Sequence, residues 1–381
     1  MQVTNIADLR REAKRILPKT VFTYVENGGY EEETLRRNLS DLQRIALLPR
    51  VLNDVSQRTL ETKLAGMPSS LPLALAPVGA CGLTYPNGEV EAARAAKEIG
   101  IPFCLSTLSI STIEDVHEGT HSPFWFQLYL MRDRQVGNAL VERARDAGCS
   151  TLVLSMDLHV RSQRHPESKR GLGAPPKIGL QNAFDALTHL RWLLRMARSK
   201  RRTFGNLIGL VPDAKDIGKI TCWLESQFDP TLSVKDIEWA RQTWSQKLFV
   251  KGILHPDDAR AAVDHGADGI IVSNHGGRQI DSAVSTISML PAIVEAVGGR
   301  GEVLVDSGIR SGMDVLKMLA SGATGCLIGR AYLYGLAWRG RIGVRRALEL
   351  IRDELDQTMA LCGVRDIRSL PRDLIVRTEQ P

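Results

Sequence analysis

The stretch Gly266-Ala267-Asp268-Gly269-Ile270-Ile271-Val272-Ser273-Asn274-His275-Gly276-Gly277-Arg278-Gln279 joins a helix end, an apolar run and a polar loop. Glycine often ends a helix because it adopts the left-handed conformation without strain, so Gly266 indicates that a helix stops there. The run that begins at Gly269 is apolar through Val272 rather than alternating, which is typical of a parallel strand buried on both faces. The stretch therefore predicts a strand over 269–274 with polar side chains at its carboxyl end.

Seven further runs of this kind occur along the chain, most of them followed by stretches with helical character. Gly322-Ala323-Thr324-Gly325 and Gly148-Cys149 repeat the helix stop and strand start of the first motif. Eight such units predict an α/β fold, the (β/α)8 TIM barrel. The alternative is an open doubly wound sheet, which usually has fewer strands, and no G-x-G-x-x-G follows the first run. The predicted strands are 73–77, 102–106, 124–129, 151–157, 247–251, 269–274, 302–306 and 324–329, and the predicted helices between them are 89–99, 135–147, 256–264, 287–297 and 311–320.

Outside the repeating units, the chain has two further parts, and we expect residues 1–381 to form one domain. Residues 1–70 read as an N-terminal helical segment, with helices at 6–17 and 31–45, that caps the barrel of residues 71–365. The interval 158–246, between strands four and five, is far longer than a normal crossover. It predicts an insertion over residues 165–235.

Composition indicates a soluble globular protein, with 43% apolar and 24% charged residues. The six cysteines are scattered without a C-x-x-C pair, which fits a reducing compartment. The first twenty residues show no apolar core of a signal peptide, and no apolar stretch reaches 18 residues. We expect a cytoplasmic protein.

Polar residues end most of the predicted strands, and the carboxyl ends of barrel strands are where active sites form. Any one of them alone could be a buried, hydrogen-bonded group or a turn residue. Together they suggest a site at the barrel mouth. They are Ser106, Gln127, Tyr129, Ser155, Asp157, Lys251, Ser273, Asn274, His275 and Asp306.

The most specific motif is Ser273-Asn274-His275-Gly276-Gly277-Arg278-Gln279. The histidine can accept a proton, and the arginine can bind a carboxylate through two parallel hydrogen bonds. The two glycines let the backbone approach a ligand closely. A glycine turn with a solvated histidine is the plainer alternative, but the preceding strand places both side chains at the barrel mouth.

The chain resembles the FMN-dependent L-2-hydroxy acid oxidases and dehydrogenases, which include glycolate oxidase, flavocytochrome b2, mandelate dehydrogenase and bacterial quinone-linked lactate dehydrogenase. The resemblance extends from about residue 4 to residue 375. Besides the histidine motif it rests on Leu17-Pro18-Lys19 with Tyr24, Ala76-Pro77, Leu105-Ser106-Thr107, Phe126-Gln127-Leu128-Tyr129, Val250-Lys251-Gly252, Asp306-Ser307-Gly308-Ile309-Arg310 and Ile328-Gly329-Arg330.

The resemblance implies roles for individual side chains. His275 would be the catalytic base, and Asp157 beside it would favour the protonated imidazole. Arg278 and Arg164 would bind the substrate carboxylate, and the hydroxyls of Tyr24 and Tyr129 would steady the substrate. The implied FMN-binding residues are Pro77, Val78, Gly79, Ser106, Gln127, Ser155, Lys251, Ser273, Asp306, Ser307, Gly308, Arg310, Gly329 and Arg330, with Lys251 beside N1 and O2 of the flavin and the last four at its phosphate. No metal is expected.

The chain departs from the family pattern at three places. The stretch 158–165 lacks the usual residues around the second substrate arginine, so Arg161 is a rival to Arg164. Ser155 replaces a more frequent threonine and keeps the hydroxyl. Gly79 stands where the oxidases tend to have alanine, which favours a dehydrogenase over an oxygen-using oxidase.

The chain's excess positive charge lies in the insertion. Its formal net charge is +6, and residues 177–202, with seven basic residues and one acid, account for all of it. Phe184, Leu187, Leu190, Leu194 and Ala197 recur at helical spacing, with arginines on an adjoining strip, which predicts a cationic amphipathic helix. A solvated surface helix is the alternative, and no motif accompanies the charge that would indicate nucleic-acid binding. Membrane-associated bacterial relatives carry their anchor in this interval, so we expect residues 178–204 to bind an anionic membrane surface at the inner face of the cell membrane.

The resulting hypothesis is FMN-dependent oxidation of L-lactate to pyruvate, with electrons passed to quinone or another carrier. Mandelate or a longer 2-hydroxy acid is the competing substrate, and an oxygen-using oxidase is the competing type of enzyme. A non-redox FMN isomerase and a non-catalytic flavin-binding protein are the rivals from other classes. By resemblance we expect a homotetramer.

Overall fold

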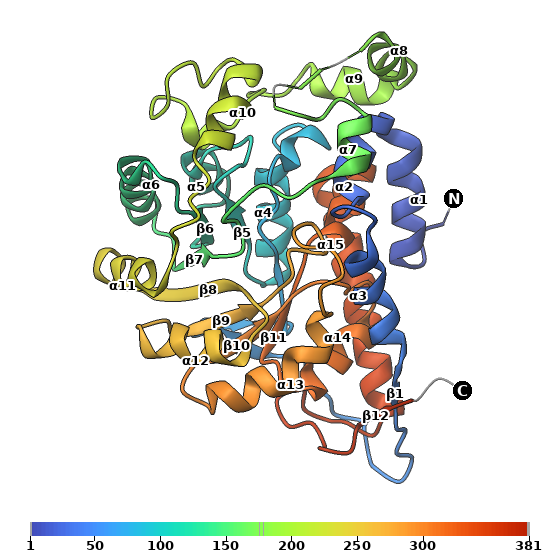
Figure 1. Ribbon diagram of the computed structural model, residues 1–381. Coiled ribbons are helices and arrows are strands. Elements are labelled where there is room, and N and C mark those ends of the chain that lie inside the picture. The colour runs from blue at the N-terminus through green and yellow to red at the C-terminus, as the bar shows by residue number, and fades with distance from the viewer. Residues whose placement is uncertain (1, 175, 178, 379–381) are drawn as a thin grey trace.

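Eight parallel strands form the centre of the protein (Figure 1), which a computed structural model describes over residues 2–174, 176–177 and 179–378. Their order is β4-β11-β10-β9-β8-β7-β6-β5. A bridge between Leu75 and Phe103, with Leu75 N donating to Pro102 O at 2.9 Å, joins the two outer strands. The predicted (β/α)8 barrel is confirmed. The strands are β4 (Leu73–Leu75), β5 (Cys104–Ser106), β6 (Trp125–Tyr129), β7 (Thr151–Ser155), β8 (Lys247–Ile253), β9 (Gly269–Val272), β10 (Glu302–Val305) and β11 (Gly325–Ile328).

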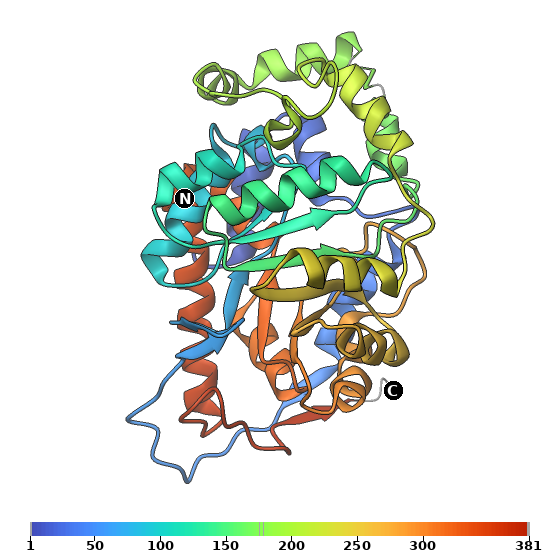
Figure 2. The same cartoon turned by 90° about the vertical axis from the view of Figure 1, so that its left-hand side faces the viewer.

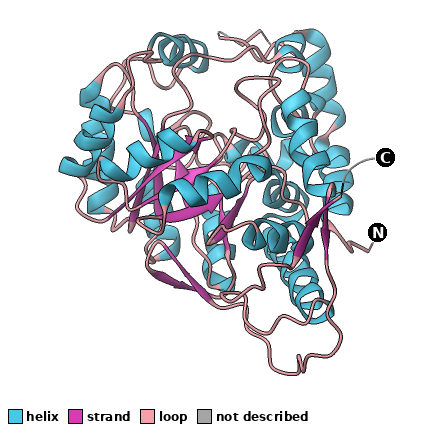
Figure 3. Cartoon of the chain, turned by 60° about the horizontal axis from the view of Figure 1, so that its bottom comes forward, coloured by secondary structure: helices cyan, strands magenta, loops and turns pink. Residues whose placement is uncertain are grey.

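Helices surround the strands on the outside of the barrel (Figure 3). The five predicted helices are present with their bounds shifted by at most one residue. Three helices had no predicted range: one precedes β8, and the other two follow β5 and β11. The helix after β11 bends at Arg339 and Gly340, whose backbone angles are not helical. The surrounding helices are α4 (Gly88–Ile99), α5 (Ile113–Thr120), α6 (Arg134–Asp146), α11 (Val234–Thr243), α12 (Pro256–Asp264), α13 (Thr286–Val297), α14 (Gly312–Ala320) and α15 (Arg330–Leu361).

Large apolar side chains fill the inside of the barrel. The rings of Trp125 and Phe249 stack with centroids 6.2 Å apart. The strand beside them needs a glycine, because a Cβ on Gly269 would lie 2.4 Å from the Phe249 ring. Leu64 and Ala65, in the hairpin of β2 (Thr62–Leu64) and β3 (Met67–Ser69), belong to the same apolar cluster and close the amino-terminal end.

The N-terminal segment is only partly helical, so the prediction of a helical segment over 1–70 is wrong beyond residue 43. It contains α1 (Ile6–Ile16), α2 (Lys19–Glu26) and α3 (Glu33–Gln43). The helix expected to reach residue 45 ends earlier because β1 (Ile45–Leu47) pairs antiparallel with β12 (Ile375–Arg377), a partner more than 300 residues away in the chain. Helix α1 packs against α15.

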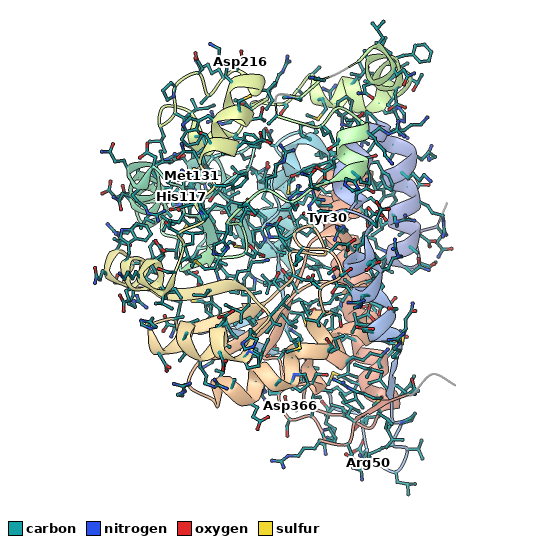
Figure 4. The ribbon with its side chains drawn as sticks, viewed as in Figure 1. Tyr30, Arg50, His117, Met131, Asp216 and Asp366 are labelled. Carbon is teal, nitrogen blue, oxygen red and sulfur yellow. The ribbon has the colours of Figure 1, made fainter. Side chains whose placement is uncertain are left out.

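The insertion lies over one end of the barrel (Figures 1 and 2). Its described elements are α7 (His165–Lys169), α8 (Leu180–Thr188), α9 (Leu190–Met196), the 3-10 turn η2 (Gly205–Leu207) and α10 (Ile217–Ser226). In Figure 4, Asp216 at the start of α10 lies at this end, whereas Arg50 and Asp366 lie at the opposite end.

The prediction of one amphipathic helix in the insertion is wrong, because α8 and α9 are separate. The chain leaves helical geometry at His189, with φ −103° and ψ 55°. Asp185 O accepts hydrogen bonds from Thr188 Oγ1 at 2.7 Å and His189 Nδ1 at 2.7 Å, which satisfy a carbonyl at the end of α8. Ile178, the first residue of the expected membrane-binding segment, lies outside the described residues.

Part of the insertion's positive charge holds it to the barrel. Arg195 donates to Ala337 O at 3.2 Å and lies over the ring of Tyr85, while Lys200 and Arg201 both bind Asp115. These cations are therefore structural rather than free for a membrane. The apolar side chains remain exposed: Leu180, Phe184, Leu187, Leu190 and Leu194. Among the described residues, no helix is long and apolar enough to cross a membrane.

Candidate active site

A cavity of about 390 Å³ lies at the carboxyl ends of the strands, beneath the insertion. Its volume is within the range of small-molecule and cofactor sites. Strand ends contribute Tyr129, Lys251 and Asp306, and the insertion contributes Phe204 and Leu224. The predicted site residues that line it are Tyr24, Pro77, Val78, Gly79, Ser106, Tyr129, Arg164, Lys251, His275, Arg278, Asp306, Ser307, Gly308, Arg310, Gly329 and Arg330, whereas Gln127, Ser155, Asp157 and Ser273 are not among the residues that line it.

His275 is held between a carboxylate and a phenol. Its Nδ1 lies 2.9 Å from Asp157 Oδ2, and its Nε2 lies 3.2 Å from Tyr129 Oη. The residue has a left-handed backbone, with φ +57°, and its N–H donates to Ser273 Oγ at 3.0 Å. Asp157 therefore fixes the imidazole orientation and leaves Nε2 toward the cavity.

Asp157 is ionised in this setting. Burial alone would raise the pKa of its carboxyl, but His275 and Lys251 outweigh burial and hold the pKa below its ordinary value. The position of this side chain depends on the neighbouring backbone, since a Cβ on Gly252, which has φ +103°, would lie 2.5 Å from Asp157 Cβ. A glycine after Lys251 is therefore required for Asp157 to reach His275.

Two tyrosines that line the cavity stay protonated. Burial and the charge of Asp157 raise the pKa of Tyr129 far above its ordinary value. Burial also raises the pKa of Tyr24, whose hydroxyl donates to Gly79 O at 3.0 Å. Both phenols are therefore hydrogen-bond donors at neutral pH rather than bases.

The two predicted substrate arginines share one buried carboxylate that the sequence did not point to. Arg278 Nη2 donates to Glu167 Oε1 at 2.6 Å, and Arg164 Nη1 lies 3.6 Å from Glu167 Oε2. Arg278 also donates to Tyr24 O and Asn27 O and lies over the Tyr24 ring. Because Glu167 stands three residues after Arg164, the helical i, i+3 spacing of opposite charges was a signal that could have revealed it.

The rival arginine of the sequence analysis lies elsewhere on the cavity wall. Arg161 forms an ion pair with Glu225 of α10, and both are partly exposed. Arg164 instead interacts electrostatically with Arg278, Tyr24 and Tyr129, and burial and Arg278 lower its pKa. The geometry thus favours Arg164 as the second cation of a carboxylate site.

Lys251 supplies a further buried positive charge in the same cavity. Its Nζ donates to Ser273 Oγ at 2.7 Å and lies 3.0 Å from Asp306 Oδ2. Burial by itself lowers the pKa of the ammonium, but Asp306 and Asp157 raise it further than burial lowers it. Lys251 is therefore a fixed cation.

The loops after β4 and β5 meet at the cavity wall. Ala80 N donates to Leu108 O at 2.8 Å, so the backbone around Gly79 is tied to the next loop. Ser106 Oγ donates to Gln127 Oε1 at 3.1 Å. The buried Gln127 Nε2 has no hydrogen-bond partner among the described residues. Ser155 lines a small adjoining cavity together with Tyr129.

The far end of the cavity is positively charged. Burial, followed by the charges of Arg278 and Arg310, lowers the pKa of Arg330 to about 10, which reflects how close these guanidinium groups lie. Arg330 itself donates to the carbonyls of Val25, Glu26, Asn27 and Gly276. Gly308 and Gly329, the residue before α15, border this end, where a helix N-terminus favours an anion.

A further residue missed by sequence reasoning supports the histidine loop from α3. Asn38 and Asn274 exchange two side-chain hydrogen bonds, of 2.9 and 2.7 Å, and both are buried. Asn274 Oδ1 also accepts from Gly277 N at 3.1 Å. Nothing in the sequence indicated that Asn38 pairs with Asn274, since the two residues lie 236 positions apart.

These residues fit FMN in three ways. The positive end around Gly308, Arg310 and Gly329 suits a phosphate, the buried Lys251 suits a ring that becomes negatively charged, and the unpaired Gln127 Nε2 suits a ring acceptor. Arg164 and Arg278 line the same cavity and could bind a second anionic group, a carboxylate. The arrangement can therefore hold a phosphorylated cofactor and a small anionic substrate together.

Comparisons with known proteins agree with this geometry. The family model of FMN-dependent dehydrogenases matches residues 13–377. The L-lactate dehydrogenase of Caulobacter sp. (strain K31) is 43% identical over 381 residues, the full length of both chains. The crystal structure of the monotopic membrane protein (S)-mandelate dehydrogenase superimposes with a TM-score of 0.94 at 36% identity, covering 99% of this chain and 100% of that one. The crystal structure of mandelate oxidase superimposes with a TM-score of 0.82 at 36% identity, covering 96% of each chain.

Proposed function

Because the chain belongs to the family of FMN-dependent dehydrogenases, we propose that it oxidises L-2-hydroxy acids to 2-oxo acids, with L-lactate as substrate and pyruvate as product. FMN is its cofactor and accepts the two electrons. The observation that carries the proposal is the His275 imidazole, held by Asp157 at 2.9 Å in the same cavity as Arg278. The full-length match of this chain to a relative named L-lactate dehydrogenase favours L-lactate as the substrate.

The proposed roles follow from the chemistry of each group. Arg278 and Arg164 bind the substrate carboxylate and so orient the hydroxyl-bearing carbon. His275 Nε2 takes a proton from the substrate, and the ionised Asp157 stabilises the imidazolium that forms. The raised pKa values of both phenols keep Tyr129 and Tyr24 protonated, so Tyr129 can donate a hydrogen bond to the substrate. The Tyr24 hydroxyl donates to Gly79 O and can accept a hydrogen bond from the substrate.

The cofactor's partners are proposed on the same basis. Lys251 would hold the flavin ring and supply a fixed positive charge there, which would favour electron acceptance by the cofactor. Gly308, Arg310, Gly329 and Arg330 form the phosphate site. The remaining residues proposed to bind FMN are Pro77, Val78, Gly79, Ser106, Gln127, Ser155, Ser273, Asp306 and Ser307.

We propose a quinone as electron acceptor and peripheral binding to the inner face of the cell membrane. Five apolar side chains of α8 and α9 are more than half exposed, which is unusual for one patch of a soluble surface. The solved (S)-mandelate dehydrogenase is described as a monotopic membrane protein. Deleting residues 178–204 should move the protein from the membrane to the soluble fraction while activity with a soluble dye persists. Continued sedimentation with membranes would contradict this.

The function is tested by mixing the FMN-loaded protein with L-lactate under anaerobic conditions. Loss of the flavin absorbance band is expected, and an unchanged spectrum with every 2-hydroxy acid tried would overturn the proposal. His275→Gln should retain FMN but lose turnover by about a hundredfold or more. Near-normal turnover of this variant would refute the role of His275.

(S)-mandelate is the second candidate substrate, because the solved mandelate dehydrogenase matches this chain with a TM-score of 0.94. A small apolar cavity adjoins the main one beside Tyr129 and is lined by Leu108, Leu158 and Phe228, among others. A panel of 2-hydroxy acids with an artificial acceptor separates the two: the larger kcat/KM identifies the substrate.

A further inference from the structure

Glu167 is a buried carboxylate in the cavity that the proposed chemistry does not use. It lies in α7, and only 4% of its side chain is exposed. Its Oε1 accepts from Arg278 Nη2 at 2.6 Å, and its Oε2 lies 3.6 Å from Arg164 Nη1. Burying a carboxylate is costly unless it is paired, and here both cations beside it belong to the proposed substrate site.

Glu167 controls how many hydrogen bonds Arg278 can offer to a ligand. A guanidinium has five N–H donors. Among the described residues, three are used: two by Tyr24 O and Asn27 O, and one by Glu167. The guanidinium is thus fixed on two sides, and the two remaining donors are what a carboxylate needs for a bidentate contact.

Glu167 also sets the net charge of the carboxylate site. Arg278 and Arg164 are close enough that their mutual repulsion, together with burial, lowers the pKa of Arg164. Glu167 offsets one of the two positive charges of Arg278 and Arg164, and the guanidinium of Arg330, which shares Asn27 O with Arg278, keeps the surroundings positive. Arg164 Nε is buried and has no partner in the described part of the chain, so this cation still has a donor for an incoming anion.

We propose that Glu167 is a positioning residue: it holds Arg278 in the orientation that binds the substrate and offsets one positive charge of the site. The inference rests on the proposed function and deepens it, since it assigns a singly charged carboxylate as the group bound between Arg278 and Arg164. Glu167 contacts the arginines and takes no proton in the reaction.

Three variants of the FMN-loaded protein test the proposal. In Glu167→Ala, Arg278 loses one anchor. In Glu167→Gln, the amide oxygen still accepts from Arg278, but the negative charge is gone. The matched control is Glu31→Gln, which removes the carboxylate that contacts His165 at the start of α7 without touching either arginine. FMN content and thermal unfolding are recorded for each.

The main measurement is a titration with pyruvate, a singly charged carboxylate, followed by the visible spectrum of the bound FMN, and it needs no turnover. We expect Glu167→Ala to weaken pyruvate binding about tenfold or more and to raise KM for L-lactate in parallel. We expect Glu167→Gln to bind pyruvate at least as tightly as the unmodified protein, because its geometry is kept and its repulsive charge removed. The Glu31→Gln control should stay within twofold.

Several outcomes would overturn the proposal. They are pyruvate affinity within twofold of the unmodified protein in Glu167→Ala, equal weakening in Glu167→Ala and Glu167→Gln, or an unmodified protein whose spectrum pyruvate does not change. If Glu167→Ala fails to fold, the change in pyruvate affinity in Glu167→Gln decides alone. Unchanged or tighter binding supports the proposal, and weaker binding overturns it. A protein that binds pyruvate but is not bleached by any 2-hydroxy acid would refute the proposed function and leave the role of Glu167 standing.

Discussion

Replacing Asp157 with asparagine isolates the charge behind His275. The amide oxygen of asparagine can still accept the Nδ1 hydrogen bond across the 2.9 Å now spanned by Asp157 Oδ2. A hydrogen bond to a charged group contributes about 1.5–3 kcal/mol, and one between neutral groups about 0.5–1.5 kcal/mol. The imidazolium formed when His275 takes the proton should therefore lose about 1–2 kcal/mol of stabilisation.

That loss corresponds to a rate decrease of about 5- to 30-fold, because each 1.36 kcal/mol is tenfold. The assay is anaerobic stopped-flow mixing of the FMN-loaded Asp157→Asn protein with saturating L-lactate, following the loss of flavin absorbance. KM should change little, since the carboxylate is bound by Arg278 and Arg164 rather than by Asp157. A reduction rate within twofold of the unmodified protein would show that the charge of Asp157 is not what supports His275.

Three further predictions concern the frame around the site. Burial raises the pKa of Glu302 to about 7, above its ordinary 4.5, so the stability associated with its protonated form is present below pH 4.5 and is lost as pH rises through 7. Each unit of pKa difference corresponds to about 1.36 kcal/mol, so the unfolding free energy of Glu302→Gln, relative to that of the unmodified protein, should rise by about 3 kcal/mol between pH 4.5 and 8. Urea titrations at both pH values measure this, and the same free-energy difference at both would contradict the prediction. Asn38→Leu leaves the buried Asn274 amide without its partner, so we expect a loss of about 1–3 kcal/mol in unfolding free energy and a lower flavin reduction rate, whereas full activity would show that the pair does not position His275. Trp125→Ala empties the inside of the barrel and should destabilise it by about 3–5 kcal/mol, read from the denaturant midpoint, and a loss below 1 kcal/mol would mean that the barrel interior had collapsed around the gap.

The barrel could be predicted from the sequence because its strands are buried on both faces. A continuous apolar run such as 269–272 followed by Ser273 and His275 carries both the strand and its functional end. The helices between strands were predictable because their ends are marked by glycine and capping residues. Position at a strand end predicted only some of the residues that line the cavity, and the others came from the family resemblance. Those predicted by position are Ser106, Tyr129, Lys251, His275 and Asp306.

Most of the features that the sequence did not predict depend on residues far away in the chain. The strand at Ile45 forms only because residues 375–377 lie beside it, and Asn38 matters only because Asn274 faces it. The break between α8 and α9 arises from side chains that bind Asp185 O, a local competition that helical periodicity does not register. Glu167 was missed because its importance comes from Arg278, 111 residues later.

The carbonyls at the end of α2 have a consequence for how the protein is made. Tyr24 O and Asn27 O accept from Arg278, and Asn27 O also accepts from Arg330, across as many as 303 residues of chain. A helix near the start of the chain therefore has its final carbonyls satisfied only after nearly the whole protein has left the ribosome. Contacts this distant in sequence slow folding, and until they form the early segment exposes apolar surface that invites aggregation. The N-terminal cap is thus the first part to be synthesised and among the last to be completed.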